Sequence, residues 1–114
     1  MIDAPAVDAV VEQYSRHGWT LRRILVTKAP PETFSSKFLN IEIQPSDIDA
    51  IWFSRINRNS ETWELRRLTG APFALVRSID RGLFSHDRDE LLHDVELKMS
   101  KTLQRSDGEN PSEK

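Results

Sequence analysis

Cysteine is absent from this sequence of 114 residues. That absence excludes disulfides and thiolate metal sites, and it suits a reducing compartment, so we predict a cytoplasmic protein. The residues that follow Met1 lack the basic segment and the apolar run of a secretory signal. Apolar runs throughout the chain are far shorter than the ~20 residues that a membrane-spanning helix requires, so no membrane segment is predicted.

Sequence motifs of catalysis are also missing. The four glycines stand singly, which excludes a glycine-rich phosphate loop, and there is neither a G-x-S-x-G turn nor an HExxH zinc-binding pair. The nearest candidate for acid–base chemistry is Glu64, which lies between two apolar residues. We expect Glu64 to face solvent instead and to pair across strands with Arg55, Arg66 or Arg77. The sequence therefore predicts no enzyme and no cofactor.

Charge is abundant, at 30% of the residues, and it is unevenly distributed around a net charge of −2. Residues 1–15 carry −3, residues 16–81 carry +4 and residues 82–114 carry −3. In one interpretation, two acidic helical segments pack on a basic sheet. In the other, a basic surface is reserved for an anionic partner. The length suits one domain, which we place at 1–104, followed by a disordered polar tail at 105–114.

Three runs of alternating apolar and polar residues lie between positions 49 and 79, separated by two clusters of turn-forming residues. This pattern is typical of a β-meander, in which consecutive strands are antiparallel neighbours. Asn57 and Asn59 in the first cluster and Gly70 in the second would supply residues that tolerate positive φ. Both faces of the run at 50–56 are apolar, which predicts either a central strand with cover on both sides or one exposed aromatic residue.

The N-terminal part of the chain predicts a helix and then a strand. Apolar residues recur at helical spacing from Val7 to Tyr14, so we expect a helix over 4–17, with Gly18 placed to end it. The alternation at 19–27 predicts the first strand.

The connection from 28 to 47 is long for a compact domain. Its polar residues at 32–37 indicate a loop or one helical turn, and the weak alternation at 38–43 indicates a short edge strand. Long connections often carry function, so this segment is one of two places where we expect a site.

The last predicted element is a helix that starts near Asp87. Asp87 and Glu90 form an acidic capping box at its start. Its apolar stripe consists of residues at helical spacing: Leu92, Val95, Met99 and Leu103.

Together these elements predict an α+β fold in the order α-β-(β)-β-β-β-α. The sheet would be four- to five-stranded and mostly antiparallel, flanked by N-terminal and C-terminal helices. We expect both helices on one face of the sheet. The alternative, with one helix on each face, is favoured by the doubly apolar run at 50–56. The element order is analogous to that of small bacterial chaperone-like or adaptor domains, an analogy that concerns the order alone.

Arginine and tryptophan side chains on adjacent strands form the best binding signal in the sequence. The candidate residues are Trp52, Arg55, Trp63, Arg66, Arg67 and Arg77. Such residues are enriched at protein interfaces, and an uncovered edge strand at 19–27 or 73–79 could pair with another chain. We therefore predict a non-catalytic protein-binding or adaptor module whose ligand is a protein partner or a second copy in a homodimer.

The alternative function is binding of single-stranded nucleic acid. Bases would stack on the aromatic rings, and the same arginines, joined by Arg22 and Arg23, would contact phosphates. No small-molecule ligand is indicated by any motif.

One cluster has the chemistry of a metal site. His86, Glu90 and His93 are spaced to share one face of the C-terminal helix, and two imidazoles with a carboxylate could hold zinc or iron. The simpler interpretation is a solvated helical turn opposite the apolar stripe, and we predict no metal site.

Overall fold

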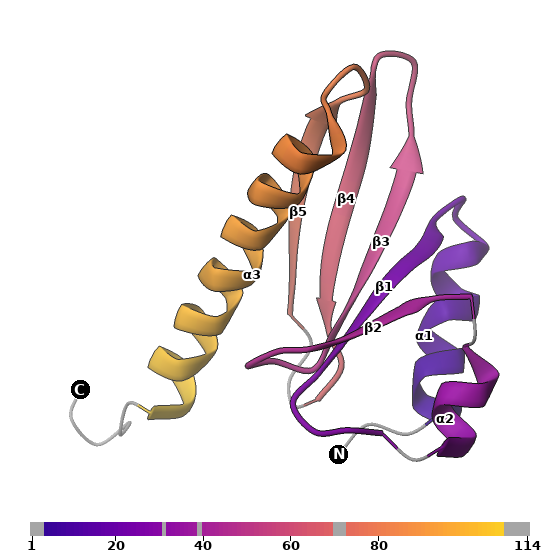
Figure 1. Ribbon diagram of the computed structural model, residues 1–114, viewed down its shortest axis with the longest axis vertical. Helices are drawn as coiled ribbons and strands as arrows, with labels where there is room; N and C mark the ends of the chain where they lie inside the picture. The colour runs from indigo at the N-terminus through magenta and orange to yellow at the C-terminus, as the bar shows by residue number, and fades with distance from the viewer. Residues whose placement is uncertain (1–3, 31, 39, 70–72, 109–114) are drawn as a thin grey trace. The chain divides into compact units, whose positions relative to one another are not determined.

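The computed structural model describes residues 4–30, 32–38, 40–69 and 73–108. The chain divides into two compact units, Met1–Arg81 and Gly82–Lys114. The first unit contains a five-stranded sheet with the strand order β2-β1-β3-β4-β5 (Figure 1). The second contains one long helix. The predicted α+β class is confirmed.

The elements follow the predicted order, with one added short helix. In chain order they are α1 (Ala4–Ser15), β1 (Thr20–Val26), α2 (Glu32–Lys37), β2 (Glu42–Pro45), β3 (Ala50–Ile56), β4 (Ser60–Arg67), β5 (Ala74–Asp80) and α3 (Ser85–Gly108).

Strands β3, β4 and β5 form the predicted β-meander. Each pairs antiparallel with the next, with Trp52 opposite Leu65 and Trp63 opposite Arg77. The turn between β3 and β4 is closed by the Asn57 amide, which donates to the Ser60 carbonyl at 2.8 Å. No described residue other than glycine has a positive φ, so the expected role of the asparagines in this turn is wrong. Gly70, the residue expected to shape the second turn, lies outside the described residues.

Strand β1 is an interior strand, because β2 covers its outer edge in a parallel pairing that matches Ile24 with Ile43. Two expectations are corrected by this arrangement. The strand expected at 38–43 instead occupies Glu42–Pro45, and the run at 19–27 offers no free edge. The weak alternation before β2 concealed its position, since a four-residue edge strand carries little periodic signal.

The central position of β3 is confirmed, and its residues from Ala50 to Ser54 are all buried. Alternation along the strands gives the sheet two faces. We call the side that carries Ile24, Ile51, Phe53, Glu64 and Arg66 the Tyr14 face, because Tyr14 of α1 packs on it. The side that carries Trp52, Trp63, Leu65, Arg67 and Arg77 is the Trp52 face.

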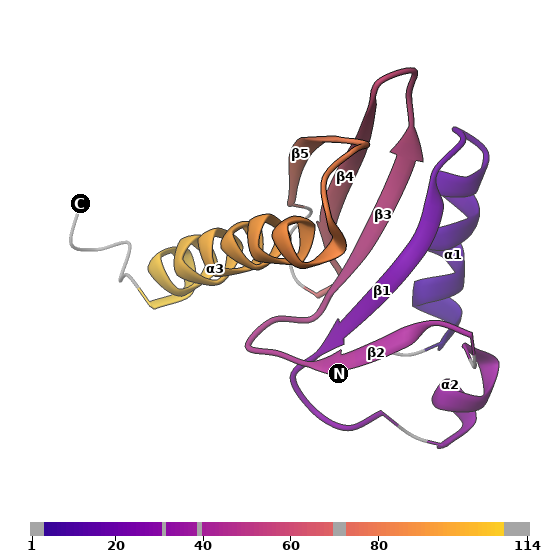
Figure 2. The same ribbon diagram turned by 45° about the horizontal axis from the view of Figure 1, so that its top comes forward.

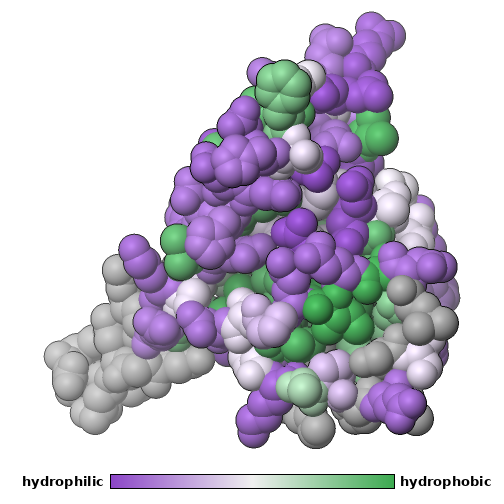
Figure 3. Space-filling view, in the orientation of Figure 1, coloured by the Kyte–Doolittle hydropathy of each residue, from purple (hydrophilic) through white to green (hydrophobic). Residues whose placement is uncertain are grey.

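Helices α1 and α2 cover the Tyr14 face over β1 and β3 (Figure 2). Val7 of α1 and Phe34 of α2 join Ile51 and Phe53 in one buried cluster. In the space-filling view, hydrophobic surface gathers near the place of β2 (Figure 3). Ile43 of β2 is half-buried and packs against the cluster. The part of this face on β4 and β5 is more open, and Val76 is 58% exposed there. A cleft can therefore form where the helical cover ends.

Helix α1 ends at Ser15, three residues before Gly18, for which the sequence predicts a left-handed conformation. Gly18 has φ +84°, a conformation that glycine adopts without the steric cost of a Cβ. The Trp19 amide then donates to the Tyr14 carbonyl at 3.1 Å, which turns the chain back toward the helix. The predicted stop is confirmed, and it places Trp19 beside the last turn of α1.

The second unit consists mainly of α3, which starts at Ser85, slightly before the predicted Asp87. The predicted stripe is visible in burial, because Leu92, Val95 and Met99 are all buried. The helix continues to Gly108, into the segment for which the sequence predicts disorder. The expectation that the N-terminal and C-terminal helices share one face of the sheet stays a prediction. Within the described residues, no helix combines the length and apolar character that crossing a membrane requires.

Candidate functional site

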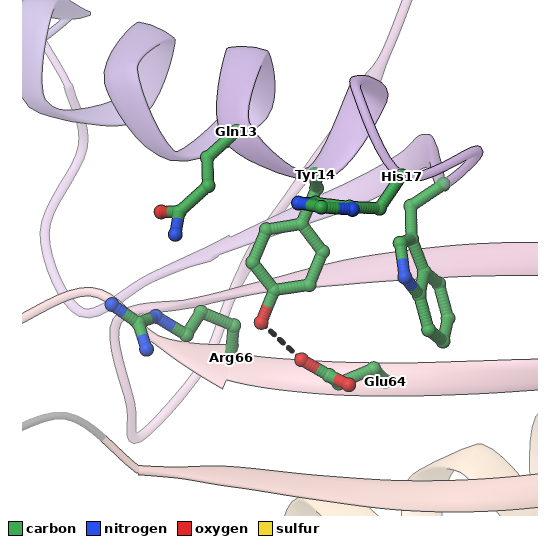
Figure 4. Close-up of a pocket in the computed structure, with 6 residues that line it drawn as sticks. Gln13, Tyr14, His17, Glu64 and Arg66 are labelled. Carbon is green, nitrogen blue, oxygen red and sulfur yellow. Dashed lines mark hydrogen bonds between the residues drawn. The ribbon is translucent and has the colours of Figure 1, made fainter.

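A small cleft of about 270 Å³ opens between the C-terminal end of α1 and strand β4 (Figure 4). Its lining combines aromatic rings with hydrogen-bonding groups of both kinds. The lining residues are Gln13, Tyr14, His17, Trp19, Glu64 and Arg66.

Tyr14 occupies the middle of the cleft, where the core and the polar groups meet. Its ring stacks on Phe53, with centroids 4.0 Å apart and planes inclined by 11°, and meets the Trp19 ring edge-on at 6.0 Å. Its hydroxyl donates a hydrogen bond to Oε2 of Glu64. An acceptor for this hydroxyl is expected, since tyrosine buries its ring readily but its O–H needs a partner.

Glu64 is therefore placed differently from the expectation. It points across the sheet toward α1 and accepts from Tyr14, and the structure shows no ion pair between Glu64 and an arginine of the described strands. Alternation on β4 explains the position, because Glu64 lies opposite Phe53 and shares its face. The sequence pattern placed Glu64 on the face opposite Trp63, but it could not show that α1 reaches over that face.

The protonation of Tyr14 follows from this environment. Burial raises the pKa of Tyr14 well above its ordinary value of about 10. The hydrogen bond to Glu64 and the negative charge of Glu64 raise this pKa further, whereas the positive charge of Arg66 lowers it. The phenol consequently keeps its proton over the whole physiological range.

This shift predicts how stability changes at alkaline pH. Above about pH 10 the unfolded chain loses the Tyr14 proton while the folded chain retains it, so the free energy of unfolding falls as pH rises. Below pH ~10 the contribution of the protonated Tyr14 to the free energy of unfolding is fully present. Tyr14→Phe removes this contribution, so the difference between the unfolding free energies of wild type and variant should shrink as the pH rises above about 10. Urea titrations at several pH values measure this, and a constant difference between the two proteins would contradict it.

Arg66 is the second unusual group in the cleft. Its Nε is buried, and no acceptor among the described residues lies within hydrogen-bond distance. A buried donor without a partner costs about 1–3 kcal/mol. Arg66 lies two positions after Glu64 on β4 and shares its face, so the guanidinium lines the same cleft.

The six predicted binding residues do not form one surface. Trp52, Trp63, Arg67 and Arg77 belong to the Trp52 face, whereas Arg55 and Arg66 belong to the Tyr14 face. Both tryptophans are buried, at 0% and 2% exposure, with rings edge-to-face at 6.0 Å. Arg55 and Arg77 are exposed, and Arg66 and Arg67 are half-buried.

Three arginines named for nucleic acid already have partners within the chain. Arg22 lies 4.8 Å from the centre of the Trp63 ring and donates to Ser54 Oγ at 3.2 Å. Arg55 lies 4.9 Å from the centre of the Trp19 ring. Arg23 pairs with Glu42 at 3.1 Å. Stacked guanidinium groups of this kind stabilise the aromatic rings that they cover.

The long connection at 28–47 supplies core residues. Phe34 and Phe38 are buried and lie 5.1 Å apart, and Lys37 of α2 forms an ion pair with Asp8 of α1. These contacts hold α2 against α1, so this segment closes the core beneath the Tyr14 face.

The two histidines of α3 contact different glutamates. His86 lies 3.4 Å from Glu90, whereas His93 turns to Glu96 at 3.7 Å. Ligand atoms of His86, Asp87 and Glu90 come within 4.8 Å of one another, but all three side chains are exposed. His86, Glu90 and His93 line one open hollow on α3, but His93 contacts Glu96 and is not one of the three residues whose ligand atoms lie close together.

The sequence contained a signal for only part of the cleft. Tyr14 was recognisable as an apolar-face residue, but its hydroxyl required an acceptor that only the fold supplies. Gln13 and His17 carried no signal, because their position beside β4 depends on the angle at which α1 lies on the sheet. Comparison with models of protein families, with curated proteins and with solved structures finds no match for this chain.

Proposed function

We propose that this chain is a non-catalytic protein-binding module that accepts an extended segment along the outer edge of β5. The proposal rests on the direction in which the backbone N–H and C=O groups of β5 point. The Arg67 amide donates to the Phe73 carbonyl at 2.8 Å, which makes this a hydrogen-bonded pair of the β4–β5 ladder. Antiparallel ladders alternate, so Ala74, Val76 and Ser78 direct their N–H and C=O groups away from β4.

The outer edge of β5 has the properties of a strand-pairing site. It is a seven-residue strand with one strand neighbour, and Ala74, Val76 and Ser78 are all exposed. The other edge is less suitable, because β2 has four residues and ends at Pro45, which has no N–H to donate. Backbone hydrogen bonds would supply affinity, and the exposed Val76 would contact an alternate side chain of the added strand.

A second copy of the chain is the occupant best supported by this strand. In an antiparallel pairing centred on Val76, Val76 meets its own counterpart and Ala74 meets Ser78, with no like charges opposed. A pairing centred on Arg77 would instead place two guanidinium groups directly opposite each other, which is unfavourable. The first register is therefore the expected one.

Val76→Pro tests the proposal. Proline removes the outward N–H without touching the ladder to β4, so the fold should persist while pairing is lost. Val76→Thr is the matched control, because it keeps the N–H and the branched shape. In sedimentation from low to high micromolar concentration, we expect wild type and Val76→Thr to dimerise and Val76→Pro to stay monomeric.

If wild type stays monomeric, selection from a random decapeptide display library measures whether another protein is the ligand. Peptides that bind wild type and lose binding to Val76→Pro would support a protein partner at β5. A monomer that selects no peptide would contradict the proposal. Salt-sensitive binding of a single-stranded oligonucleotide, unchanged by Val76→Pro, would favour the nucleic-acid alternative.

A further inference from the structure

The cleft beside Tyr14 has two chemically different ends. In Figure 4 Arg66 and Gln13 lie on one side of the Tyr14 ring, and Glu64 lies on the other, joined to the Tyr14 hydroxyl. At the first end, a guanidinium and a side-chain amide converge. At the second end, the carboxylate is already hydrogen-bonded. The buried donor without a partner, Arg66 Nε, therefore lies at the end away from Glu64.

Arg66 is the group that indicates a ligand. Its Nε is buried yet has no acceptor among the described residues, and the cleft that it lines is open to a small molecule. A guanidinium presents its N–H groups as a planar fork that matches the two oxygens of a carboxylate. The amide of Gln13 could donate to the same group from the opposite wall.

The neighbouring charges select the kind of anion. Arg66 is the one cation on β4 in the lining, and Glu64 lies two positions away on the same face. A second negative charge on the ligand would double its repulsion from Glu64 along with its attraction to Arg66, so it brings little net gain in a lining that holds one of each. The aromatic walls then favour a carboxylate with an apolar body over a fully polar phosphate.

Size and wall chemistry restrict the rest of the ligand. A volume of about 270 Å³ lies just below the usual range of small-molecule sites, which begins at roughly 300 Å³. The rings of Tyr14 and Trp19 provide apolar walls, and Phe53 supports the Tyr14 ring from behind. A flat body of a few carbon atoms fits such walls.

We propose that this cleft is a binding site for a small monocarboxylate, whose carboxylate pairs with Arg66 and whose apolar body lies against Tyr14 and Trp19. This site is separate from the outer edge of β5. Residues of the two sites do not overlap, so either proposal can fail without the other.

Benzoate is the probe, and benzamide is its neutral control of the same shape. In NMR titrations of the full chain, benzoate should shift the Arg66 Nε–H resonance and bind at least about tenfold more tightly than benzamide. Inorganic phosphate should bind more weakly than benzoate. Equal affinity for benzoate and benzamide, or no shift of the Arg66 resonance, would overturn the proposal.

Variants at neighbouring positions of β4 separate the site from general charge effects. Arg66→Gln should abolish the preference for benzoate, and Arg66→Lys should restore only part of it because lysine lacks the planar fork. Arg67→Gln is the matched control, since Arg67 belongs to the Trp52 face and should leave benzoate affinity unchanged. Benzoate binding that survives in Arg66→Gln, with the NMR spectrum still that of a folded chain, would refute the assignment.

The carboxylate could also come from an acidic side chain of a partner protein. A blocked Gly-Glu-Gly peptide and its glutamine counterpart distinguish this source. A glutamate peptide that binds more tightly than benzoate would overturn the small-molecule assignment. Weaker binding of that peptide than of benzoate supports the assignment.

Discussion

Trp52→Ala is expected to lower the free energy of unfolding by about 3–5 kcal/mol, the range for truncating a large buried aromatic side chain. Trp52 has no exposed surface, lies on the central strand β3, and meets Trp63 edge-to-face at 6.0 Å. Alanine would leave a cavity that the neighbouring strands cannot fill without breaking their register. Small domains have a total stability of only ~5–15 kcal/mol, so the variant should be close to unfolding.

The matched control for Trp52→Ala is Ile56→Ala, on the same strand. Ile56 is 59% exposed, so its truncation should cost about 1 kcal/mol or less. Urea unfolding followed by circular dichroism compares the two variants without depending on tryptophan fluorescence. Similar losses in both would mean that Trp52 contributes little to the core.

This result bears on how binding is tested. A tryptophan at an interface is commonly identified by loss of binding on substitution with alanine. In this chain, Trp52→Ala and Trp63→Ala would lose binding through unfolding, because both side chains are buried. Exposed positions such as Val76 give a cleaner measurement, since their substitution leaves the core intact.

Phe53→Ala is expected to have a second large effect, about 3–5 kcal/mol, with a consequence at the cleft. Phe53 is fully buried and supports the Tyr14 ring at 4.0 Å. Its loss should also expose the Tyr14 ring, so the pKa of Tyr14 should move back toward its ordinary value of about 10. One substitution therefore tests both the core and the environment of the site.

Tyr14 is the only tyrosine of the chain, so tyrosinate absorbance reports its ionisation alone. The wild type should titrate well above pH 10 and Phe53→Ala nearer to it, as far as each stays folded. Tyr14→Phe is the structural control, because it keeps the stacked ring and should cost about 1 kcal/mol through the lost hydrogen bond. If Phe53→Ala titrates as the wild type does, the ring of Phe53 does not shield Tyr14.

The two proposed sites make use of different parts of the same sheet. The outer edge of β5 offers backbone groups and one exposed valine, which suits an extended chain. The cleft at β4 offers a guanidinium, an amide and two aromatic rings, which suits a compact anion. Both arise because α1 and α2 cover the Tyr14 face over β1 and β3 and leave β4 and β5 more open.

Local patterns in the sequence determined the meander, the positions of the N-terminal and C-terminal helices, and the buried stripe of α3, whereas the pattern at 32–37 is compatible with either a loop or one helical turn. Each of these features depends on the spacing of apolar residues within one segment, and this spacing can be read from that segment alone. The central place of β3 was one of two outcomes that its apolar faces allowed, the other being an exposed aromatic residue. The left-handed Gly18 followed from its position after a helical pattern.

Tertiary structure decided what depends on two distant segments. The parallel pairing of β2 made β1 an interior strand, and the cross-strand register divided the tryptophans and arginines between two faces. The contact from Tyr14 to Glu64 joins residues fifty positions apart. It exists because α1 crosses the sheet at one particular place and angle. Periodicity states which side of an element is apolar, but not which polar group another element will place against it.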